Sequence, residues 1–172
     1  MEQLNTRRLI LLHLDRTWIE RFAIDSKQAG AELEDFLGYP ASGRTEHPVT
    51  TYRYASSEME RHPEAEQWYR LWEILLPEEK RRIGGLLFKG PPDENGETEI
   101  GYGIDEDQRG KGYAPEAVRA AIEWAFGHGA KTIIAKINPG NTASRRVLEK
   151  VGLHEYQKIG KMPCFRIDKP NT

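Results

Sequence analysis

In the first half of the chain, one segment has the apolar pattern of a strand and another has apolar residues at helical spacing. Residues 6–12 form a largely apolar run and are expected to be a strand. Apolar residues at helical spacing predict a helix over residues 18–37, which glycine and proline residues end at 38–43. A second helix is expected over residues 56–67, inside a polar region whose pattern is weak.

The middle of the chain predicts three consecutive strands. Residues 69–76, 83–88 and 97–104 carry the strand pattern, and the turns 77–80 and 91–96 separate them. Because short turns join antiparallel neighbours, we expect an antiparallel meander.

Helices and strands alternate in the second half. A helix should begin near Pro115, because proline suits the first helical turn, and Gly127 and Gly129 should end it. We then expect, in order, a strand over 132–137, a short helix over 142–151 capped by Gly152, and strands over 153–159 and 165–167. This order predicts an α/β (α+β) fold: one domain over residues 1–172 whose mixed, mostly antiparallel central sheet has helices on both faces.

Composition narrows the class of protein. The 172 residues suit one domain, and 38% hydrophobic with 30% charged residues is ordinary for a globular chain. A formal net charge of −2 argues against a nucleic-acid partner. The early apolar run Leu9–Leu12 is too short for a membrane span or a signal peptide, so we expect no membrane partner.

Cysteine and histidine usage argues against metal chemistry. Cys164 is the single cysteine, which excludes a disulfide within the chain and a Cys-rich zinc site. We interpret it as a core residue of a protein in the reducing cytoplasm. The five histidines lack a metal-binding spacing, so no metal is predicted.

The most informative segment is residues 100–117, where a strand leads through a glycine loop into a helix. Gly110 and Gly112 allow the backbone to turn tightly, and the free N–H groups of the first helical turn form an anion site. Arg109 and Lys111 add positive charge. The alternative is that both glycines serve a tight turn alone. The P-loop and dinucleotide patterns do not fit, because the Lys-Ser/Thr pair is absent and Pro115 replaces the third small residue.

Three segments resemble one family. Arg109-Gly110-Lys111-Gly112-Tyr113-Ala114 matches the Gln/Arg-x-x-Gly-x-Gly/Ala signature of the GNAT superfamily of acetyltransferases. Residues 138–153, which begin Asn-Pro-Gly-Asn-Thr-Ala-Ser, resemble a later motif of that superfamily. The opening residues 6–11 resemble the first strand of its ribosomal-protein N-terminal acetyltransferase branch. The resemblance covers nearly the whole chain and is weakest over residues 44–67.

The resemblance implies the acyl-CoA N-acyltransferase fold and an acetyl-CoA-dependent N-acetyltransferase. The pyrophosphate of acetyl-CoA would lie on the amides of the loop, and the pantetheine arm between the strands 97–104 and 132–137. Backbone groups at the end of the first of these strands would bind the arm and the thioester oxygen. The cofactor-binding residues implied are Ile104, Arg109, Gly110, Lys111, Gly112, Tyr113, Ala114, Asn138 and Asn141.

The reaction implied is direct attack of a neutral amine on the thioester, which needs a base and an acid. Glu99 and Glu106 are the candidate bases, although Glu106 could be a solvated loop acid and water could replace both. Many superfamily members carry a Tyr that acts as the general acid at the position where this chain has Leu148. No tyrosine can therefore play that role from this position. Ser144 is the candidate donor to the thiolate, and the alternative is a surface residue. Asn141 is either a cofactor ligand or a helix N-cap.

The acceptor amine is left open between a small molecule and a protein N-terminus. Residues 25–67 should shape its pocket, and Tyr102, Trp72 and Trp124 either line it or pack in the core. Acidic residues that could attract a cation, or be solvated helix charges, are Glu46, Glu58, Glu60 and Glu64. A monomer or homodimer is expected. The alternatives to an enzyme are a non-catalytic CoA-binding regulatory module on the same fold and a generic nucleotide-phosphate binder.

Overall fold

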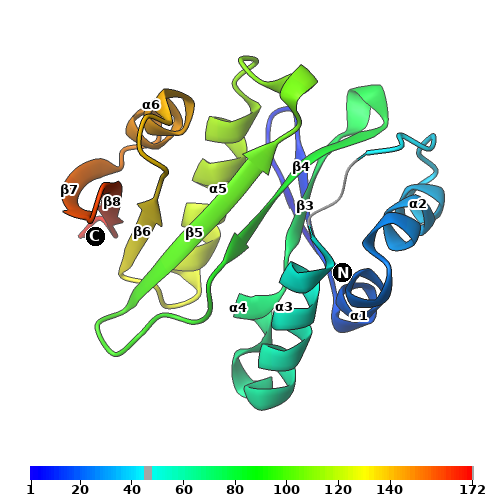
Figure 1. Cartoon of the computed structure of the whole chain (residues 1–172), viewed down its shortest axis with the longest axis horizontal. Helices are drawn as coiled ribbons and strands as arrows, with labels where there is room; N and C mark the ends of the chain where they lie inside the picture. The colour runs from blue at the N-terminus through cyan, green and yellow to red at the C-terminus, as the bar shows by residue number, and fades with distance from the viewer. Residues whose placement is uncertain (45–47, 172) are drawn as a thin grey trace.

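Eight strands form one sheet in the computed structural model, which describes residues 1–44 and 48–171 (Figure 1). The sheet order is β1-β2-β3-β4-β5-β6-β8-β7. Every neighbouring pair is antiparallel except β5 and β6, which are parallel. The strands are β1 (Glu2–Asn5), β2 (Ile10–His13), β3 (Trp72–Leu76), β4 (Arg81–Phe88), β5 (Glu97–Ile104), β6 (Thr132–Lys136), β7 (His154–Ile159) and β8 (Met162–Asp168).

Helices cover both faces of this sheet, as expected from the sequence. They are α1 (Arg16–Ile24), α2 (Ser26–Leu37), α3 (Val49–Arg61), α4 (Glu66–Tyr69), α5 (Tyr113–Gly127) and α6 (Thr142–Lys150), with the short 3₁₀ turns η1 (Pro63–Ala65), η2 (Pro77–Glu79) and η3 (Glu106–Gln108). The apolar residues of β3 alternate between two cores, because successive side chains of a strand point to opposite faces. Trp72 and Ile74 belong to the core beneath α5, and Leu75 to the core beneath α1–α3.

The predicted meander and the strand–helix alternation of the second half are confirmed. The turn-linked strands β3, β4 and β5 are antiparallel neighbours, and β5 has the predicted bounds. Gly84 of β4 lies so close to β5 that a Cβ there would be 2.2 Å from the Gly103 carbonyl oxygen. The close contact explains why glycine is needed within this strand.

The expected strand over residues 6–12 is wrong in its first half. β1 and β2 form a hairpin, and the Thr6 N–H donates to the Leu9 carbonyl oxygen at 2.9 Å. The Thr6 hydroxyl also accepts from the Leu9 N–H at 3.0 Å. Hydrogen bonds from a threonine to nearby backbone compete with strand pairing, so Thr6–Leu9 is a turn.

The expected helix over residues 18–37 is two helices that part at Asp25. The Asp25 N–H donates to the Arg21 carbonyl oxygen at 3.1 Å and ends α1, while its carboxylate accepts from the Gln28 N–H at 3.0 Å and caps α2. Asp25 has an extended backbone with φ of −147°, so the chain changes direction there.

Other boundaries also differ from the sequence prediction, among them the starts of β4 at Arg81 and β8 at Met162. The helix expected over residues 56–67 begins earlier, at Val49, and ends at Arg61. Pro63 follows closely and lacks the N–H that a continuing helix requires. The strand expected over 69–76 begins at Trp72, because Tyr69 ends α4.

A buried ion cluster fixes the position of α2 against the sheet. Arg82 of β4 is 1% exposed, and its guanidinium contacts the carboxylates of Glu34 on α2 at 3.3 Å and Glu73 on β3 at 3.1 Å. Arg44 extends the cluster, because its guanidinium contacts Glu73 at 3.5 Å and also pairs with Asp105 at 2.9 Å, just beyond the end of β5. Ionic contacts therefore connect the segment after α2 to this end of β5.

The turn Thr6–Leu9 is clamped to the start of α5 by Glu116. The Glu116 carboxylate accepts from the Thr6 hydroxyl at 2.6 Å, from the Arg8 N–H at 2.7 Å and from the Arg8 guanidinium at 2.8 Å. The same guanidinium donates to the Lys111 carbonyl oxygen at 2.9 Å. Burial alone would raise the pKa of the Glu116 carboxyl, but these hydrogen bonds outweigh burial and lower the pKa below 4.5.

Glu116→Gln should therefore lower the free energy of unfolding at pH 7 by about 1–2 kcal/mol, because charge-assisted hydrogen bonds are lost. A lowered native pKa stabilises the fold above the unfolded pKa, and that stabilisation disappears as pH falls through the native pKa. Denaturant titrations should show the gap between wild type and variant narrowing from pH 7 to pH 4. Glu123→Gln, at an exposed position of α5, is the control. An equal gap at both pH values would contradict the clamp.

Candidate functional site

The parallel strands β5 and β6 pair at three positions and then separate. The paired residues are Glu97 with Thr132, Thr98 with Ile133 and Glu99 with Ile134. Beyond Glu99, β5 keeps its pairing with β4 on one side, and no described strand pairs with its other edge. Backbone groups along an unpaired edge need another hydrogen-bonding partner, such as water or a ligand. Figure 1 shows the two strands diverging towards the end of the sheet at which α6 lies.

The glycine loop opens α5 at the wide end of this separation. Gly110 and Gly112 have φ of 76° and 83°, a left-handed conformation that favours glycine. Gly112 is the N-cap of α5 and has no side chain to bond the first helical N–H groups. The amides of Tyr113 and Ala114 are therefore available to an anion, which the helix dipole also favours.

A cavity of about 510 Å³ joins the loop, the end of β5 and one face of α6. Its size is within the range of small-ligand pockets. Eight of the predicted site residues line it: Ile104, Arg109, Gly110, Gly112, Tyr113, Ala114, Asn141 and Ser144. We call this cavity the α5–α6 cleft.

Three cationic side chains line the α5–α6 cleft. Arg109 was expected from the loop motif, and its Nε donates to the Ile104 carbonyl oxygen at 3.0 Å. Sequence reasoning missed Arg146 and Lys150 of α6. Their spacing of four residues places both on one helical face, which was a usable signal. The three cations and the helix N-terminus make the cleft attractive to phosphate groups.

Four predicted residues lie outside the lining of the cleft. The Lys111 ammonium donates to the Gln108 amide oxygen at 2.9 Å, and Asn138 lies in the turn before α6. Glu99 is 13% exposed and pairs with the ammonium groups of Lys89 at 2.5 Å and Lys136 at 3.1 Å. Glu106 is an exposed residue at the start of η3. Glu99 is thus held by two lysines, and Glu106 lies outside the lining of the cleft.

Two residues with hydroxyl groups, Ser144 from the first turn of α6 and Tyr102 from β5, lie together in the cleft. Asn141 caps the helix, because its side-chain oxygen accepts from the Ser144 N–H at 3.0 Å. The Tyr102 hydroxyl donates to the Ser144 carbonyl oxygen at 3.4 Å, and both residues line the cleft. Burial raises the pKa of Tyr102 above 10, despite the opposing effect of this hydrogen bond, so its hydroxyl stays protonated. The sequence places Tyr102 either in the acceptor pocket or in the core and gives no signal for its position beside Ser144.

Among the remaining candidate residues, three are buried in the core and another is held in an ion pair. Trp72 and Trp124 are buried in the core, with ring centroids 5.2 Å apart, and Cys164 is buried as well. Glu46 lies outside the described residues, and the Glu58 carboxylate pairs with Arg61 at 2.9 Å. Within the described ranges, the helices are too short or too polar to cross a membrane.

Comparisons with known proteins agree on one family. The model of the acetyltransferase (GNAT) domain matches residues 8–154. The uncharacterized N-acetyltransferase YjdG of Bacillus subtilis is 38% identical over 82 residues, which cover 47% of this chain and 49% of that protein. The uncharacterized N-acetyltransferase p20 of Bacillus licheniformis is 36% identical over 88 residues, covering 51% of this chain and 48% of p20. Each alignment thus spans about half of the relative's length.

Solved structures share the fold at low sequence identity. The ribosomal-protein-S5-alanine acetyltransferase of Vibrio fischeri has a TM-score of 0.64 at 17% identity, over 99% of this chain and 100% of that one. The ribosomal L7/L12 α-N-protein acetyltransferase RimL, solved with coenzyme A, has a TM-score of 0.64 at 16% identity, over 97% and 98% of the two chains. Since the family model covers most of the chain and the fold agrees, this protein belongs to the GNAT acetyltransferase domain family.

Proposed function

We propose that this protein is an N-acetyltransferase, a single domain over residues 1–172 that transfers the acetyl group of acetyl-CoA to a primary amine. The observation that carries the proposal is the α5–α6 cleft, where two parallel strands separate beside a helix N-terminus with free amides. A pyrophosphate needs such amides and nearby cations, and a pantetheine arm can hydrogen-bond an unpaired strand edge.

The residues of the cleft divide between these tasks. The amides of Gly110–Ala114, with Arg109, would bind the pyrophosphate, and Arg146 and Lys150 would add charge to the phosphate end. The edge of β5 from Ile100 to Ile104 would bind the pantetheine arm, with Asn138 and Asn141 at the start of α6 as further contacts. Lys111 would act through its backbone amide, because its ammonium is held by Gln108.

The reaction is direct transfer. The amine nitrogen attacks the thioester carbonyl carbon, the carbon–sulfur bond breaks, and the thiolate takes up a proton. The thiolate would receive a hydrogen bond from Ser144 or Tyr102, because both line the cleft and a hydrogen bond joins them. The ammonium proton would leave to water, since Glu99 is paired with two lysines and Glu106 is exposed outside the cleft.

The acceptor is either a small amine or a protein N-terminus. RimL and the enzyme of Vibrio fischeri are named for ribosomal-protein acceptors, which favours an N-terminus by analogy. A regulatory module that binds CoA without catalysis would bind acetyl-CoA and release no thiol, so turnover separates the two functions.

Acetyl-CoA should raise the melting temperature, because it binds the folded state. At about one hundred times its Kd the stabilisation is about 2.7 kcal/mol, or roughly 5–10 °C for a domain of this size. Gly112→Glu should remove this shift, because a carboxylate would occupy the anion site. Gly160→Glu, at an exposed glycine with φ of 60°, controls for backbone strain and should keep the shift. Equal shifts in both variants would contradict the proposed phosphate site.

A water-mediated loss of the ammonium proton predicts that neither carboxylate is essential. Glu99→Gln and Glu106→Gln should each keep kcat/KM within about tenfold of wild type, with the rising limb of its pH profile retained. A true general base contributes about 10²–10⁴-fold. A loss of that size in either variant, with a flattened pH profile, would assign the base to that residue.

Ser144→Ala should lower kcat by roughly 10- to 100-fold, equivalent to about 1.4–2.7 kcal/mol of barrier, while the Kd of acetyl-CoA stays nearly unchanged. The reason is that the hydroxyl acts as charge develops on sulfur. Single-turnover thiol release measures the rate, and Tyr102→Phe is measured beside it. A Ser144→Ala protein with wild-type kcat and a slow Tyr102→Phe protein would transfer the role to Tyr102.

A further inference from the structure

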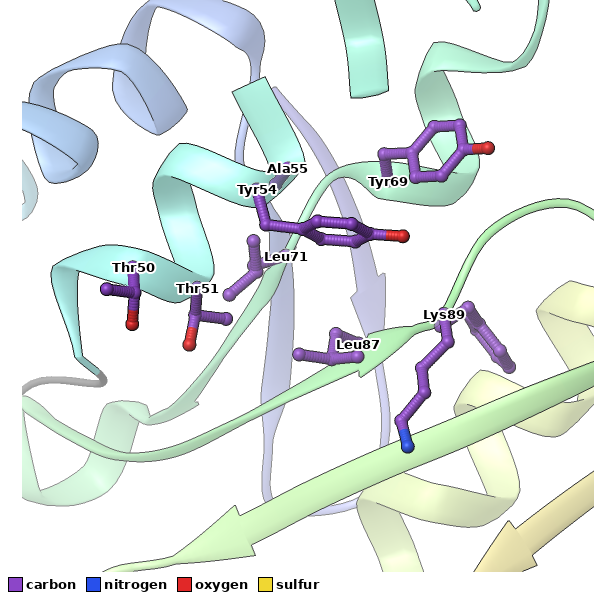
Figure 2. Close-up of a pocket in the computed structure, with 9 residues that line it drawn as sticks. Thr50, Thr51, Tyr54, Ala55, Tyr69, Leu71, Leu87 and Lys89 are labelled. Carbon is purple, nitrogen blue, oxygen red and sulfur yellow. The ribbon is translucent and has the colours of Figure 1, made fainter. Parts of the chain in front are cut away.

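A second cavity lies on the sheet face opposite α5. It has a volume of about 330 Å³ and shares no lining residue with the α5–α6 cleft. Figure 2 shows it between α3 and β4, with Tyr54 and Tyr69 above Leu71 and Leu87. Its lining residues are Thr50, Thr51, Tyr54, Ala55, Tyr69, Leu71, Leu87, Phe88 and Lys89. We call it the α3–β4 cavity.

We propose that the α3–β4 cavity holds the apolar body of the acceptor, and that the acceptor is a small primary amine carrying an aromatic or branched aliphatic group. The inference rests on the proposed function, because it assigns the substrate of the same reaction. It commits to a small molecule over a protein N-terminus.

The cavity extends to the strand that borders the cleft. Leu87 on its floor is paired with Gly101 of β5. A Cβ at Gly101 would touch Leu87 at 3.8 Å, so glycine leaves this face of β5 open to a ligand. The opposite face of the same strand carries Tyr102 into the α5–α6 cleft. A molecule in the α3–β4 cavity would therefore extend along β5 towards the cofactor.

Lys89 connects the rim of the cavity to the point where β5 and β6 separate. Its N–H donates to the Glu99 carbonyl oxygen at 2.9 Å, and its ammonium pairs with the Glu99 carboxylate. Glu99 is the last residue of β5 that pairs with β6. A primary amine entering from the cavity would therefore reach β5 at the point where β5 and β6 separate.

The lining favours an apolar group over a polycation. Most of its side chains are aliphatic or aromatic, and Tyr54 is 57% exposed, with its ring over the space above Leu87 (Figure 2). Contact between an exposed aromatic ring and a second apolar group is favourable, because it removes apolar surface from water. Among the nine lining residues none is acidic, and Lys89 is the one with a charged side chain. Polyamines require carboxylates, and the nearby Glu58 is already paired with Arg61.

The volume supports a small acceptor. About 330 Å³ is near the lower end of ligand pockets, which suits one ring or branched chain. Burial raises the pKa of Tyr69 above 10, with Glu58 adding to the shift, so its hydroxyl is a neutral donor at the wall.

The test compares primary amines in the thiol-release assay with saturating acetyl-CoA. The amines are phenethylamine, 3-methylbutylamine, ethylamine, spermidine and a short peptide with a free N-terminus. We expect kcat/KM for phenethylamine and 3-methylbutylamine to exceed that for ethylamine roughly 10- to 100-fold, because their apolar bodies leave water. A higher kcat/KM for spermidine or the peptide than for phenethylamine would overturn the inference.

A matched pair of variants locates the effect. Tyr54→Ala removes an exposed ring at the cavity and should raise KM for phenethylamine roughly three- to tenfold and KM for ethylamine by less, with KM for acetyl-CoA unchanged. Phe36→Ala removes a ring that is 65% exposed on α2, outside the cavity, and should change none of these. Identical behaviour of the two variants would overturn the inference.

Two outcomes separate this inference from the proposed function. If acetyl-CoA raises the melting temperature and none of the amines accelerates thiol release, or ethylamine reacts as well as phenethylamine, the acceptor assignment is wrong and the cofactor site stands. If acetyl-CoA gives no melting shift, the proposed function is wrong and the acceptor assignment is lost with it.

Discussion

The short parallel pairing of β5 with β6 is the constraint on which the rest of the site depends. Each strand is held on its other side by an antiparallel partner, β5 by β4 and β6 by β8, over five residue pairs each. The two strands can therefore separate beyond Glu99 without either losing its place in the sheet. The separation leaves a strand edge to be satisfied by another molecule, and it opens towards the N-termini of α5 and α6.

Both faces of β5 carry part of the proposed reaction. One face contributes Tyr102 to the α5–α6 cleft, and the other presents Gly101 to Leu87 in the α3–β4 cavity. Contacts between distant segments hold the surroundings in place: Glu116 ties the first hairpin to the start of α5, and the Arg82 cluster ties α2 to the sheet. The space between the separated strands can serve as a binding site because these contacts hold the elements on both sides of it in place.

Local signals allowed much of the fold and the anion loop to be predicted from the sequence. β5 and α5 were found because strand alternation, two glycines and Pro115 lie within one short segment. The division at Asp25 was missed because aspartate is tolerated within a helical pattern, and its double capping role depends on the actual backbone path. The Glu116 clamp joins residues 108 positions apart, and the α3–β4 cavity requires packed elements, so neither has a local signature.

Backbone amide hydrogen exchange, measured with and without acetyl-CoA, tests the central claim most directly. If the separated strands bind the cofactor, exchange should slow at the β5 edge over residues 100–104 and at the loop amides over 110–114, while the α3–β4 cavity stays unchanged. Slowing confined to other segments, or none at a concentration that raises the melting temperature, would contradict the account.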